Sequence, residues 1–272
     1  MKILYLTDLD GTLLSSAEHV SDYTAKVVNS FIKNGGCFSY ATARSFVTAS
    51  KVTENLNIPL PVICFNGGFT MDGQSGEILA SNYFTLDLKA EIMNAIPNFD
   101  ILPIVFAHIN GIERFSYVNH SVNCGTSHFL DRRKNDNRRR EVQVIEELFE
   151  GDTFTFVFIG DLSQTQPIYD YFASNKEINC IHHKDVYSGS YWLELLPAKV
   201  SKANAALELK KMLGCDKLIV FGDGANDLSM FLVADQCYAM ENAVPELKEI
   251  ATGIIGTNDN DGVAKWLEAN VI

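Results

Sequence analysis

The sequence predicts an α/β protein with a doubly wound, mostly parallel, Rossmann-like core sheet and an inserted α/β cap domain. From the first strand to the strand that ends at Phe65, and again from near Ser201, apolar runs of strand length alternate with segments of helical period. This alternation predicts parallel strands with helices on both faces of the sheet. Between residues 84 and 189 the alternation is lost. We therefore expect one core from residues 1–83 and 190–272, with an inserted domain at 84–189.

Composition and end signals indicate each core element. The first strand begins at Ile3 and is apolar enough to be buried on both faces. A helix begins near Asp22, has apolar residues at helical spacing and stops at Gly35-Gly36. By the same criteria we expect further strands at Cys37–Ala41, Val62–Phe65, Lys217–Phe221 and Cys237–Met240, and further helices at Phe46–Leu56, Lys202–Leu213, Asn226–Val233, after Pro245, and at Gly262–Ala269.

The middle of the chain shows a weaker pattern. Residues 71–76 are typical of a hairpin turn between two β-like stretches. Beyond them we expect helices at Asp87–Ala95 and Arg138–Glu150, and strands at Ile101–Ala107, Ile112–Tyr117, Phe154–Ile159 and Tyr191–Leu196.

Bulk composition excludes several classes of protein. The 272 residues are 47% hydrophobic, yet no apolar run approaches the roughly 18 residues of a membrane span. We expect a cytoplasmic protein, because no signal peptide is visible and the six cysteines are widely spaced without metal-finger patterns. The net charge of −12 argues against general binding of nucleic acid. A monomer or a homodimer is expected, without a nucleic-acid or membrane partner.

The most informative stretch follows the first strand, where Asp8 and Asp10 flank Leu9 and precede Gly11. Alternation along a strand starts the two carboxylates on one face. Two carboxylates about 4 Å apart repel by roughly 4 kcal/mol at an effective dielectric constant of about 20. Magnesium relieves such repulsion, since it favours oxygen ligands and is commonly held by one or two carboxylates plus a substrate phosphate.

Three further segments lie at predicted strand ends or helix starts. Thr42 ends the second strand, Lys202 begins a helix, and residues 222–227 (Gly-Asp-Gly-Ala-Asn-Asp) follow a buried strand. Each alone is common in plain turns and helix starts. Together with Asp8 they would meet beyond the carboxyl ends of a doubly wound sheet. Carboxylates, a hydroxyl and an ammonium in one crevice indicate phosphoryl transfer.

These four segments, in this order, resemble the four motifs of the haloacid dehalogenase-like hydrolases, and the large insertion resembles the cap of their Cof-type branch. The string Asp8-Leu9-Asp10-Gly11-Thr12 matches the first motif. The resemblance covers the whole core and, more loosely, the cap. Smaller signatures agree with it: Phe65-Asn66-Gly67-Gly68, Pro197-x-x-Val200-Ser201-Lys202, Glu241-Asn242-Ala243 and Asn260-Asp261-Gly262-Val263-Ala264.

The resemblance implies a role for each matching residue. Asp8 would be the nucleophile that forms an aspartyl-phosphate, and Asp10 the general acid and then the general base. Thr42 and Lys202 would hold the phosphoryl oxygens, Thr12 would brace the loop, and Asn226 would help to fix the phosphoryl group or Lys202. Mg²⁺ would be bound by Asp8, the backbone carbonyl of Asp10, and Asp223, with Asp227 orienting a bound water. Arg44 would be a further cation beside the site.

One position departs from the family pattern. Many members have Gly after the threonine of the second motif, where this chain has Ala43. If that position required a positive φ, Ala43 would be strained.

The inserted domain is expected to choose the leaving group. Its polar candidates for meeting a sugar or another polyol are His108, Asn110, Asn119, His120, Asn123, His182, His183 and Tyr187. Two basic runs, 132–134 and 138–140, could meet a polyanion, although interleaved acidic residues favour a solvated surface.

The resemblance thus implies a Mg²⁺-dependent phosphatase acting on a small phosphate ester such as a sugar phosphate. A phosphomutase, which returns the phosphoryl group to a sugar, is an alternative. Dehalogenase chemistry fits less well, because it does not need Asp10, Asp223 or Asp227. A non-catalytic binding protein would be expected to lack one of these groups, and none is missing.

Overall fold

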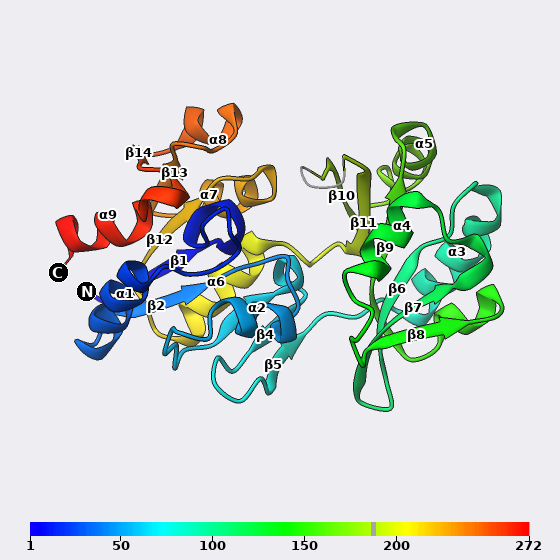
Figure 1. The fold of residues 1–272 in the computed structure, drawn as a ribbon, viewed down its shortest axis with the longest axis horizontal. Coiled ribbons are helices and arrows are strands. Elements are labelled where there is room, and N and C mark those ends of the chain that lie inside the picture. Colours follow the sequence, from blue (N-terminus) through cyan, green and yellow to red (C-terminus); the bar gives the residue numbers. More distant parts are fainter. Residues whose placement is uncertain (186–188, 272) are drawn as a thin grey trace. The chain divides into compact units, whose positions relative to one another are not determined.

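The computed structural model describes residues 1–185 and 189–271 and divides the chain into two compact units. Unit 1 comprises Met1–Ser81 and Val200–Ile272, and unit 2 comprises Asn82–Lys199 (Figure 1). The expected fold class, a parallel α/β core with an inserted α/β domain, is confirmed. Tyr187, a candidate from the sequence, lies outside the described residues.

Unit 1 is built on a five-stranded sheet whose neighbouring strands are all parallel. Its order is β14-β13-β12-β1-β2, so β1 lies between β12 and β2. The first and last parts of the chain therefore form a single sheet. The strands are β1 (Ile3–Thr7), β2 (Cys37–Tyr40), β12 (Lys217–Gly222), β13 (Gln236–Met240) and β14 (Gly253–Ile255).

Two groups of helices cover this sheet. Helices α1 and α9 pack against each other, where Tyr5 of β1 contacts Phe31 and Trp266. In the second group, α6 packs against α7, and α7 packs against α8. The helices of unit 1 are α1 (Asp22–Lys33), α2 (Phe46–Val52), α6 (Lys202–Met212), α7 (Leu228–Val233), α8 (Pro245–Ile250) and α9 (Gly262–Asn270).

The third expected core strand is only marginally part of the parallel sheet. Strand β3 (Val62–Cys64) joins β4 (Phe69–Met71) and β5 (Ile78–Ser81) in a separate antiparallel sheet. One parallel bridge, Ala41 to Ile63, links it to the end of β2. The pairing of β4 with β5 confirms the hairpin at residues 71–76.

Unit 2 has a six-stranded sheet in the order β10-β11-β9-β6-β7-β8, antiparallel except for β7 and β8. Two hydrophobic cores lie on opposite faces of this sheet, as adjacent residues of the central strand β9 show. Phe156 belongs to the core that includes α3 and α5, and Val157 belongs to the core that includes α4. Its strands are β6 (Ile104–Ile109), β7 (Ile112–Val118), β8 (Arg139–Val142), β9 (Asp152–Gly160), β10 (Ile178–Lys184) and β11 (Tyr191–Pro197). Its helices are α3 (Leu86–Ala95), α4 (Cys124–Asp131) and α5 (Leu162–Phe172).

The expected helix at Arg138–Glu150 is wrong. Residues 139–142 form β8, which pairs in parallel with β7, and residues 145–149 form a short helical turn. Glu147 accepts hydrogen bonds from the backbone N–H groups of Gln143 and Val144, at 2.8 and 3.4 Å, which starts that turn. Pairing with a neighbouring strand thus outweighs the intrinsic helix propensity of this charged segment.

The sequence interpretation also misplaced the domain boundary and missed α4, α5, β10 and β14. Unit 1 resumes at Val200 rather than at residue 190, because β11 pairs with β9 and β10 inside unit 2. Helix α5 carried a start signal, a capping box in which Asp161 N–H donates to Gln164 at 3.0 Å. Its internal Pro167 obscured the helical pattern.

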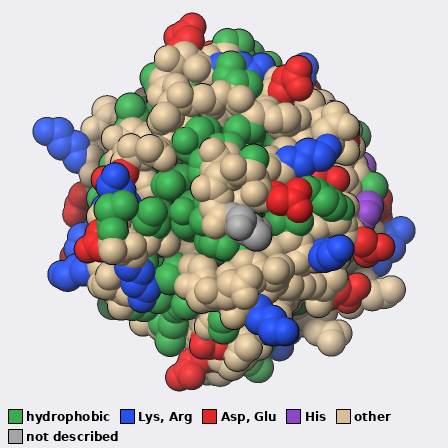
Figure 2. Space-filling view, turned by 90° about the vertical axis from the view of Figure 1, so that its left-hand side faces the viewer, with side chains coloured by type: hydrophobic (Ala, Val, Ile, Leu, Met, Phe, Trp, Pro, Cys, Tyr) green, Lys and Arg blue, Asp and Glu red, His purple; other side chains and the backbone are tan. Residues whose placement is uncertain are grey.

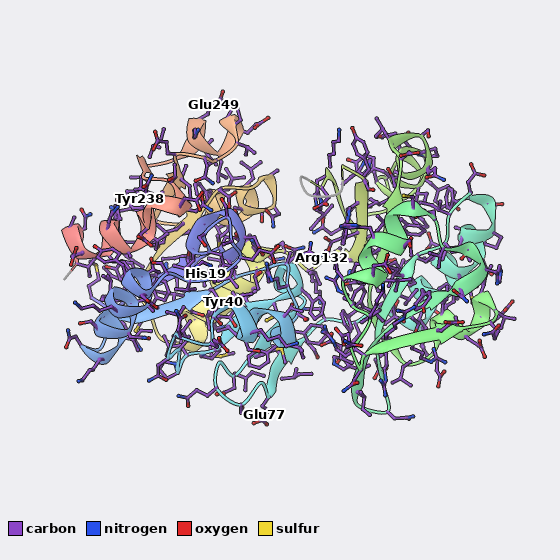
Figure 3. All side chains as sticks on the ribbon, in the orientation of Figure 1. His19, Tyr40, Glu77, Arg132, Tyr238 and Glu249 are labelled. Carbon is purple, nitrogen blue, oxygen red and sulfur yellow. The ribbon has the colours of Figure 1, made fainter. Side chains whose placement is uncertain are left out.

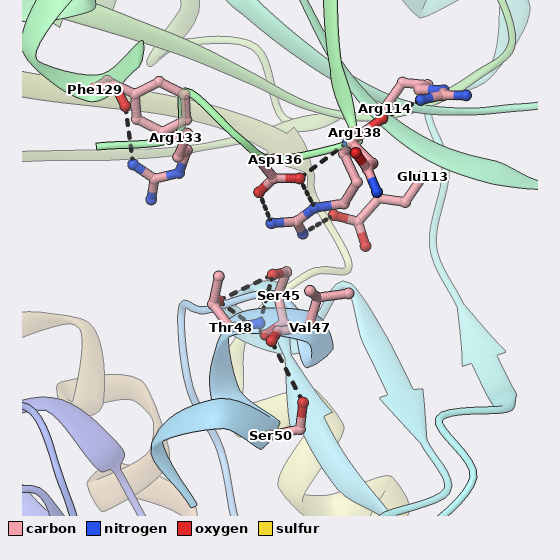
Figure 4. A network of polar contacts seen from close by, with 11 residues as sticks. Ser45, Val47, Thr48, Ser50, Glu113, Arg114, Phe129, Arg133, Asp136 and Arg138 are labelled. Carbon is pink, nitrogen blue, oxygen red and sulfur yellow. Dashed lines mark hydrogen bonds and ion pairs between the residues drawn. The ribbon is translucent and has the colours of Figure 1, made fainter. Parts of the chain in front are cut away.

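Short polar residues start the helices that border the site. Ser45 accepts a hydrogen bond from Thr48 N–H at the start of α2 (Figure 4), and Ser201 accepts one from Asn204 N–H at 3.1 Å at the start of α6. These N-caps fix where α2 and α6 begin. Lys202 therefore becomes the first residue of α6.

The structure also shows the state of the cysteines and the distribution of surface charge. All six cysteines are free. On the face of Figure 2, acidic and basic side chains are dispersed, so the charge of −12 is not gathered there into one patch. Among the described helices, none combines the length and apolar character required to cross a bilayer.

We predict that Gly67→Ala destabilises unit 1 more than Gly35→Ala does. Both glycines have positive φ, +99° and +90°, so both substitutions carry a backbone penalty of about 1–2 kcal/mol. A Cβ at Gly67 would also lie 2.4 Å from the Ser201 carbonyl oxygen, whereas one at Gly35 would meet nothing within 4 Å. Urea unfolding should show the Gly67 variant less stable by about a further 1–3 kcal/mol. Equal losses would contradict the close approach.

Candidate active site

The sheet order brings the first and last motifs together at the carboxyl end of β1. Asp8 follows β1 directly, and its backbone N–H donates to the Phe221 carbonyl of β12 at 2.9 Å. On the other side, Ala41 N–H donates to the Thr7 carbonyl at 2.8 Å, just after Tyr40, the last residue of β2 (Figure 3). Residues over 200 positions apart in the chain are thereby neighbours, as the sequence predicts.

Lys202 is the central cation of the site. Its Nζ donates to Asp8 Oδ1 at 2.5 Å and to Asp227 Oδ1 at 2.6 Å. Lys202 is 1% exposed, Asp227 0% and Asp8 5%, so the three charges are removed from water together. Such a burial is tolerated only when each charge has a close partner.

Asp223 lies next to this group and is held by the first loop. Thr12 Oγ1 donates to Asp223 Oδ1 at 2.7 Å, so Thr12 braces the loop as expected. Gly11 has φ +77°, and a Cβ there would lie 2.2 Å from Asp223 Oδ2. Only glycine both adopts this backbone conformation and leaves room for the carboxylate.

Asp227 has a second task besides its ion pair. Its Oδ2 accepts hydrogen bonds from the backbone N–H groups of Asp223, at 3.1 Å, and Gly224, at 3.0 Å. One carboxylate therefore shapes the loop after β12 and also positions Lys202. The loop and the cation are coupled through this side chain.

Burial and neighbouring charges together shift the pKa values of the cluster. Burial raises the pKa of Asp8 well above its usual value, and although Lys202 opposes the shift, the carboxylates of Asp227, Asp223 and Asp10 add to it. Burial likewise raises the pKa of Asp223 to about 6, with the Thr12 hydrogen bond opposing it. Burial alone would lower the pKa of Lys202, but Asp227 and Asp8 outweigh burial and raise it.

Three carboxylates in the described part of the chain meet the requirements of a cation site. Asp8, Asp223 and Asp227 each offer an oxygen, and these oxygens lie within 4.8 Å of one another. Lys202 supplies one positive charge against three carboxylates, so a divalent cation with oxygen ligands fits the donor set. The Asp10 side chain, an expected neighbour, does not belong to this group.

Asp10 is paired with Arg44 instead. Arg44 Nε donates to Asp10 Oδ2 at 2.7 Å, and Arg44 Nη2 donates to Asp10 Oδ1 at 2.5 Å. The same Nη2 lies 3.3 Å from Glu18 Oε2. Asp10 and Glu18 together raise the pKa of Arg44, although burial alone would lower it. Arg44, expected as a cation for the substrate, thus engages two carboxylates of its own unit.

Thr42 and Asn226 also have partners within unit 1. The Thr42 hydroxyl is buried and accepts a hydrogen bond from Arg44 N–H at 3.1 Å. Asn226 Nδ2 donates to Asn66 Oδ1 at 3.4 Å. Both lie in the expected segments, Thr42 just beyond β2 and Asn226 between β12 and α7.

Three asparagines that are not among the expected site residues brace the site. Asn242 Nδ2 donates to the Gly11 carbonyl at 2.8 Å, and Asn258 Nδ2 donates to the Leu14 carbonyl at 2.9 Å. Asn66, the partner of Asn226, has φ +54° and is buried. Asn66 and Asn242 lie within quoted signature strings, which was the available signal. Asn258 lies just outside one.

The departure at Ala43 carries no strain. The described non-glycine residues with positive φ are Glu18, Phe65, Asn66, Asn110 and Asp261. Ala43 is not among them, so this backbone position accepts a side chain without the penalty considered above.

Three of the polar candidates of unit 2 have partners within unit 2. Asn123 caps α4, His108 lies 3.1 Å from the Tyr83 hydroxyl, and the His182 ring stacks on Tyr169. Burial lowers the pKa of His108, His182 and His183.

In the second basic run of unit 2, Arg138 and Arg140 are paired with carboxylates and Arg139 with a hydroxyl. Arg138 donates to Asp136 at 2.6 Å and to Glu113 at 2.5 Å (Figure 4). Arg139 donates to the Tyr117 hydroxyl at 2.8 Å, and Arg140 pairs with Glu150. All three arginines of this run thus bond to residues of unit 2.

The whole chain is similar to proteins of one family. Residues 5–267 match the family model of the haloacid dehalogenase-like hydrolases. Two proteins of Bacillus subtilis, each named a 5-amino-6-(5-phospho-D-ribitylamino)uracil phosphatase, are 24% and 26% identical. The matches cover 97% and 96% of this chain, and 96% and 95% of those proteins.

A solved structure shows the same fold. It is a haloacid dehalogenase-like hydrolase from B. subtilis, with a TM-score of 0.80, 22% sequence identity and 100% of each chain covered.

We predict that Lys202→Met destabilises the protein by about 3–5 kcal/mol, because it leaves Asp8 and Asp227 buried without their cation. Lys210→Met is the matched control. Lys210 pairs with Asp235 at 2.9 Å near the surface, where loss of an ion pair costs about 1 kcal/mol or less. Urea unfolding followed by circular dichroism gives both values. Similar losses in the two variants would contradict the central place of Lys202.

Proposed function

The chain belongs to the haloacid dehalogenase-like hydrolases and is a phosphatase of that family, and we propose that it hydrolyses a small phosphorylated metabolite, with Mg²⁺, through an aspartyl-phosphate on Asp8. The supporting observation is the buried cluster in which Lys202 bridges Asp8 and Asp227 with Asp223 beside them. This arrangement supports the proposal, because a carboxylate that could act as nucleophile lies beside a cation and two further carboxylates that could hold a metal ion.

The proposed reaction has two steps. In the first, a carboxylate oxygen of Asp8 forms a bond to phosphorus while the ester P–O bond breaks, and Asp10 gives its proton to the leaving oxygen. In the second, water attacks the phosphorus of the aspartyl-phosphate and gives a proton to Asp10. The bond between phosphorus and Asp8 breaks, which releases phosphate and restores the carboxylate. Splitting the transfer into two steps is the benefit of a covalent nucleophile.

Asp8, Asp223 and the backbone carbonyl of Asp10 would hold the metal ion, and Asp227 would orient a water bound to it. When bound, Mg²⁺ would offset the negative charge of the carboxylates and of the phosphoryl group. The chain itself keeps Asp223 in place through Thr12, and keeps the loop after β12 in place through Asp227. These contacts hold the ligands in a fixed geometry before substrate enters.

The remaining expected residues fall into two groups. Lys202 is already aligned with Asp8, and Thr42 lies at the end of the strand next to β1, so both are suited to hold phosphoryl oxygens. Arg44 bonds to Asp10, and Asn226 bonds to Asn66. We therefore propose that Arg44 and Asn226 contribute by positioning these partners.

The substrate proposed here carries its phosphate on a sugar or another polyol. Two relatives are named for a substrate with a phosphorylated ribityl chain, and the sequence of unit 2 offers polar residues suited to hydroxyl groups. Unit 2 is accordingly proposed as the domain that chooses the leaving group. A screen of phosphorylated sugars and sugar alcohols by kcat/KM tests this assignment, and preference for an apolar ester would contradict it.

We predict that the protein releases inorganic phosphate from p-nitrophenyl phosphate with Mg²⁺, that EDTA abolishes this activity, and that added Mg²⁺ restores it. Asp8→Asn should lower kcat by at least about 10³-fold, because the amide is a poor nucleophile, while Asp100→Asn on the surface of unit 2 should not. Activity that persists in Asp8→Asn would refute the nucleophile. Transfer of phosphate to a sugar instead of water would indicate a phosphomutase.

A further inference from the structure

The connection between β1 and α1 contains a strained turn. Glu18 has φ +56°, in the left-handed region that residues other than glycine and asparagine seldom adopt. The turn is closed by Ser15 N–H donating to the His19 carbonyl at 3.0 Å and by Glu18 N–H donating to the Ser15 carbonyl at 2.9 Å. His19, at its end, is labelled in Figure 3. Strain of this kind persists where the position serves a purpose.

The turn sets the Glu18 carboxylate against Arg44. One guanidinium nitrogen, Nη2, lies 3.3 Å from Glu18 Oε2 and donates to Asp10 Oδ1 at 2.5 Å. Arg44 is therefore shared between two carboxylates. The side chains of Asp10 and Glu18 are 41% and 32% exposed, and that of Arg44 is 20% exposed, so all three reach water and can change partners.

This sharing bears on the proposed reaction. Arg44 engages both oxygens of Asp10, through Nε and Nη2. A carboxyl group that must give a proton to a leaving oxygen has to turn at least one oxygen towards the substrate. Arg44 must then release that oxygen, and its charge needs another partner. Glu18 already stands within reach of the same nitrogen.

We propose that Glu18 is a positioning residue that draws Arg44 away from Asp10 when substrate is bound, and so frees Asp10 to protonate the leaving oxygen. The inference rests on the proposed function. In the step itself the Asp8–phosphorus bond forms, the ester P–O bond breaks, and the proton passes from Asp10 to the leaving oxygen. Arg44 keeps its protons throughout and changes only its partner.

Two aryl esters of nearly equal shape test the proposal. The p-nitrophenolate group leaves without a proton, whereas the phenolate of phenyl phosphate is a poorer leaving group and depends more on general acid catalysis. With Mg²⁺ present, Glu18→Gln should lower kcat/KM for phenyl phosphate about tenfold. This is part of the roughly 10²–10⁴-fold rate enhancement that a general acid supplies. For p-nitrophenyl phosphate the loss should stay below about threefold.

Glu249→Gln is the matched control, because it removes the same charge from an exposed site on α8 (Figure 3). It should leave both substrates unaffected. Glu18→Asn distinguishes the proposed role of the carboxylate from a role of residue 18 in the stability of the turn, since asparagine accepts positive φ. It should raise the midpoint of thermal unfolding, or leave it unchanged, and still show the selective loss with phenyl phosphate. Recovery of activity in this variant would overturn the proposal and leave Glu18 a purely structural residue.

The same measurements distinguish failure of the role of Glu18 from failure of the proposed function. If the wild-type protein hydrolyses both esters and Glu18→Gln lowers them equally or not at all, the role of Glu18 is wrong and the proposed function stands. If the wild-type protein releases phosphate from neither ester with Mg²⁺, both are wrong.

Discussion

The site depends on the ammonium of Lys202 between two buried carboxylates. Asp8 and Asp227 are almost fully removed from water, and each loses solvation that only a nearby positive charge can replace. Lys202 reaches both at 2.5 and 2.6 Å from the first turn of α6. Since α6 follows the whole of unit 2 in sequence, the arrangement requires the two halves of unit 1 to fold as one body.

The surrounding loops convert this charge arrangement into fixed geometry. Asp227 receives two backbone N–H groups, Thr12 donates to Asp223, and Asn242 donates to the Gly11 carbonyl. The Asp227 contacts shape its own loop, whereas those of Thr12 and Asn242 join the beginning of the chain to its last third. Preorganised dipoles and charges lower the cost of reorganising the site during a reaction. The same contacts explain why small changes, such as a methyl group at Gly11, would be poorly tolerated.

The first loop places its two carboxylates in different surroundings. Asp8 lies among buried charges, whereas Asp10 is 41% exposed and paired with Arg44. Two acidic groups that must perform different tasks in one reaction need different environments. Only one residue separates them in sequence, but the turn at Gly11 and the position of Arg44 beyond β2 give them different neighbours.

The alternation of apolar runs predicts the parallel core and the inserted domain, and polar residues at strand ends predict the segments that meet at the site. The sequence alone leaves the contacts between these segments open. It could not determine which polar side chains meet. Arg44 and Asn226 lie in the expected segments, but no local pattern indicated their contacts with Asp10 and Asn66, and Glu18 carried no signal at all. Residues 138–150 illustrate the same limit, since pairing with β7 decided their conformation against their helix propensity. Local patterns encode an element, but only the packed chain fixes its partners, because hydrogen bonds and charges act between segments that are remote in sequence.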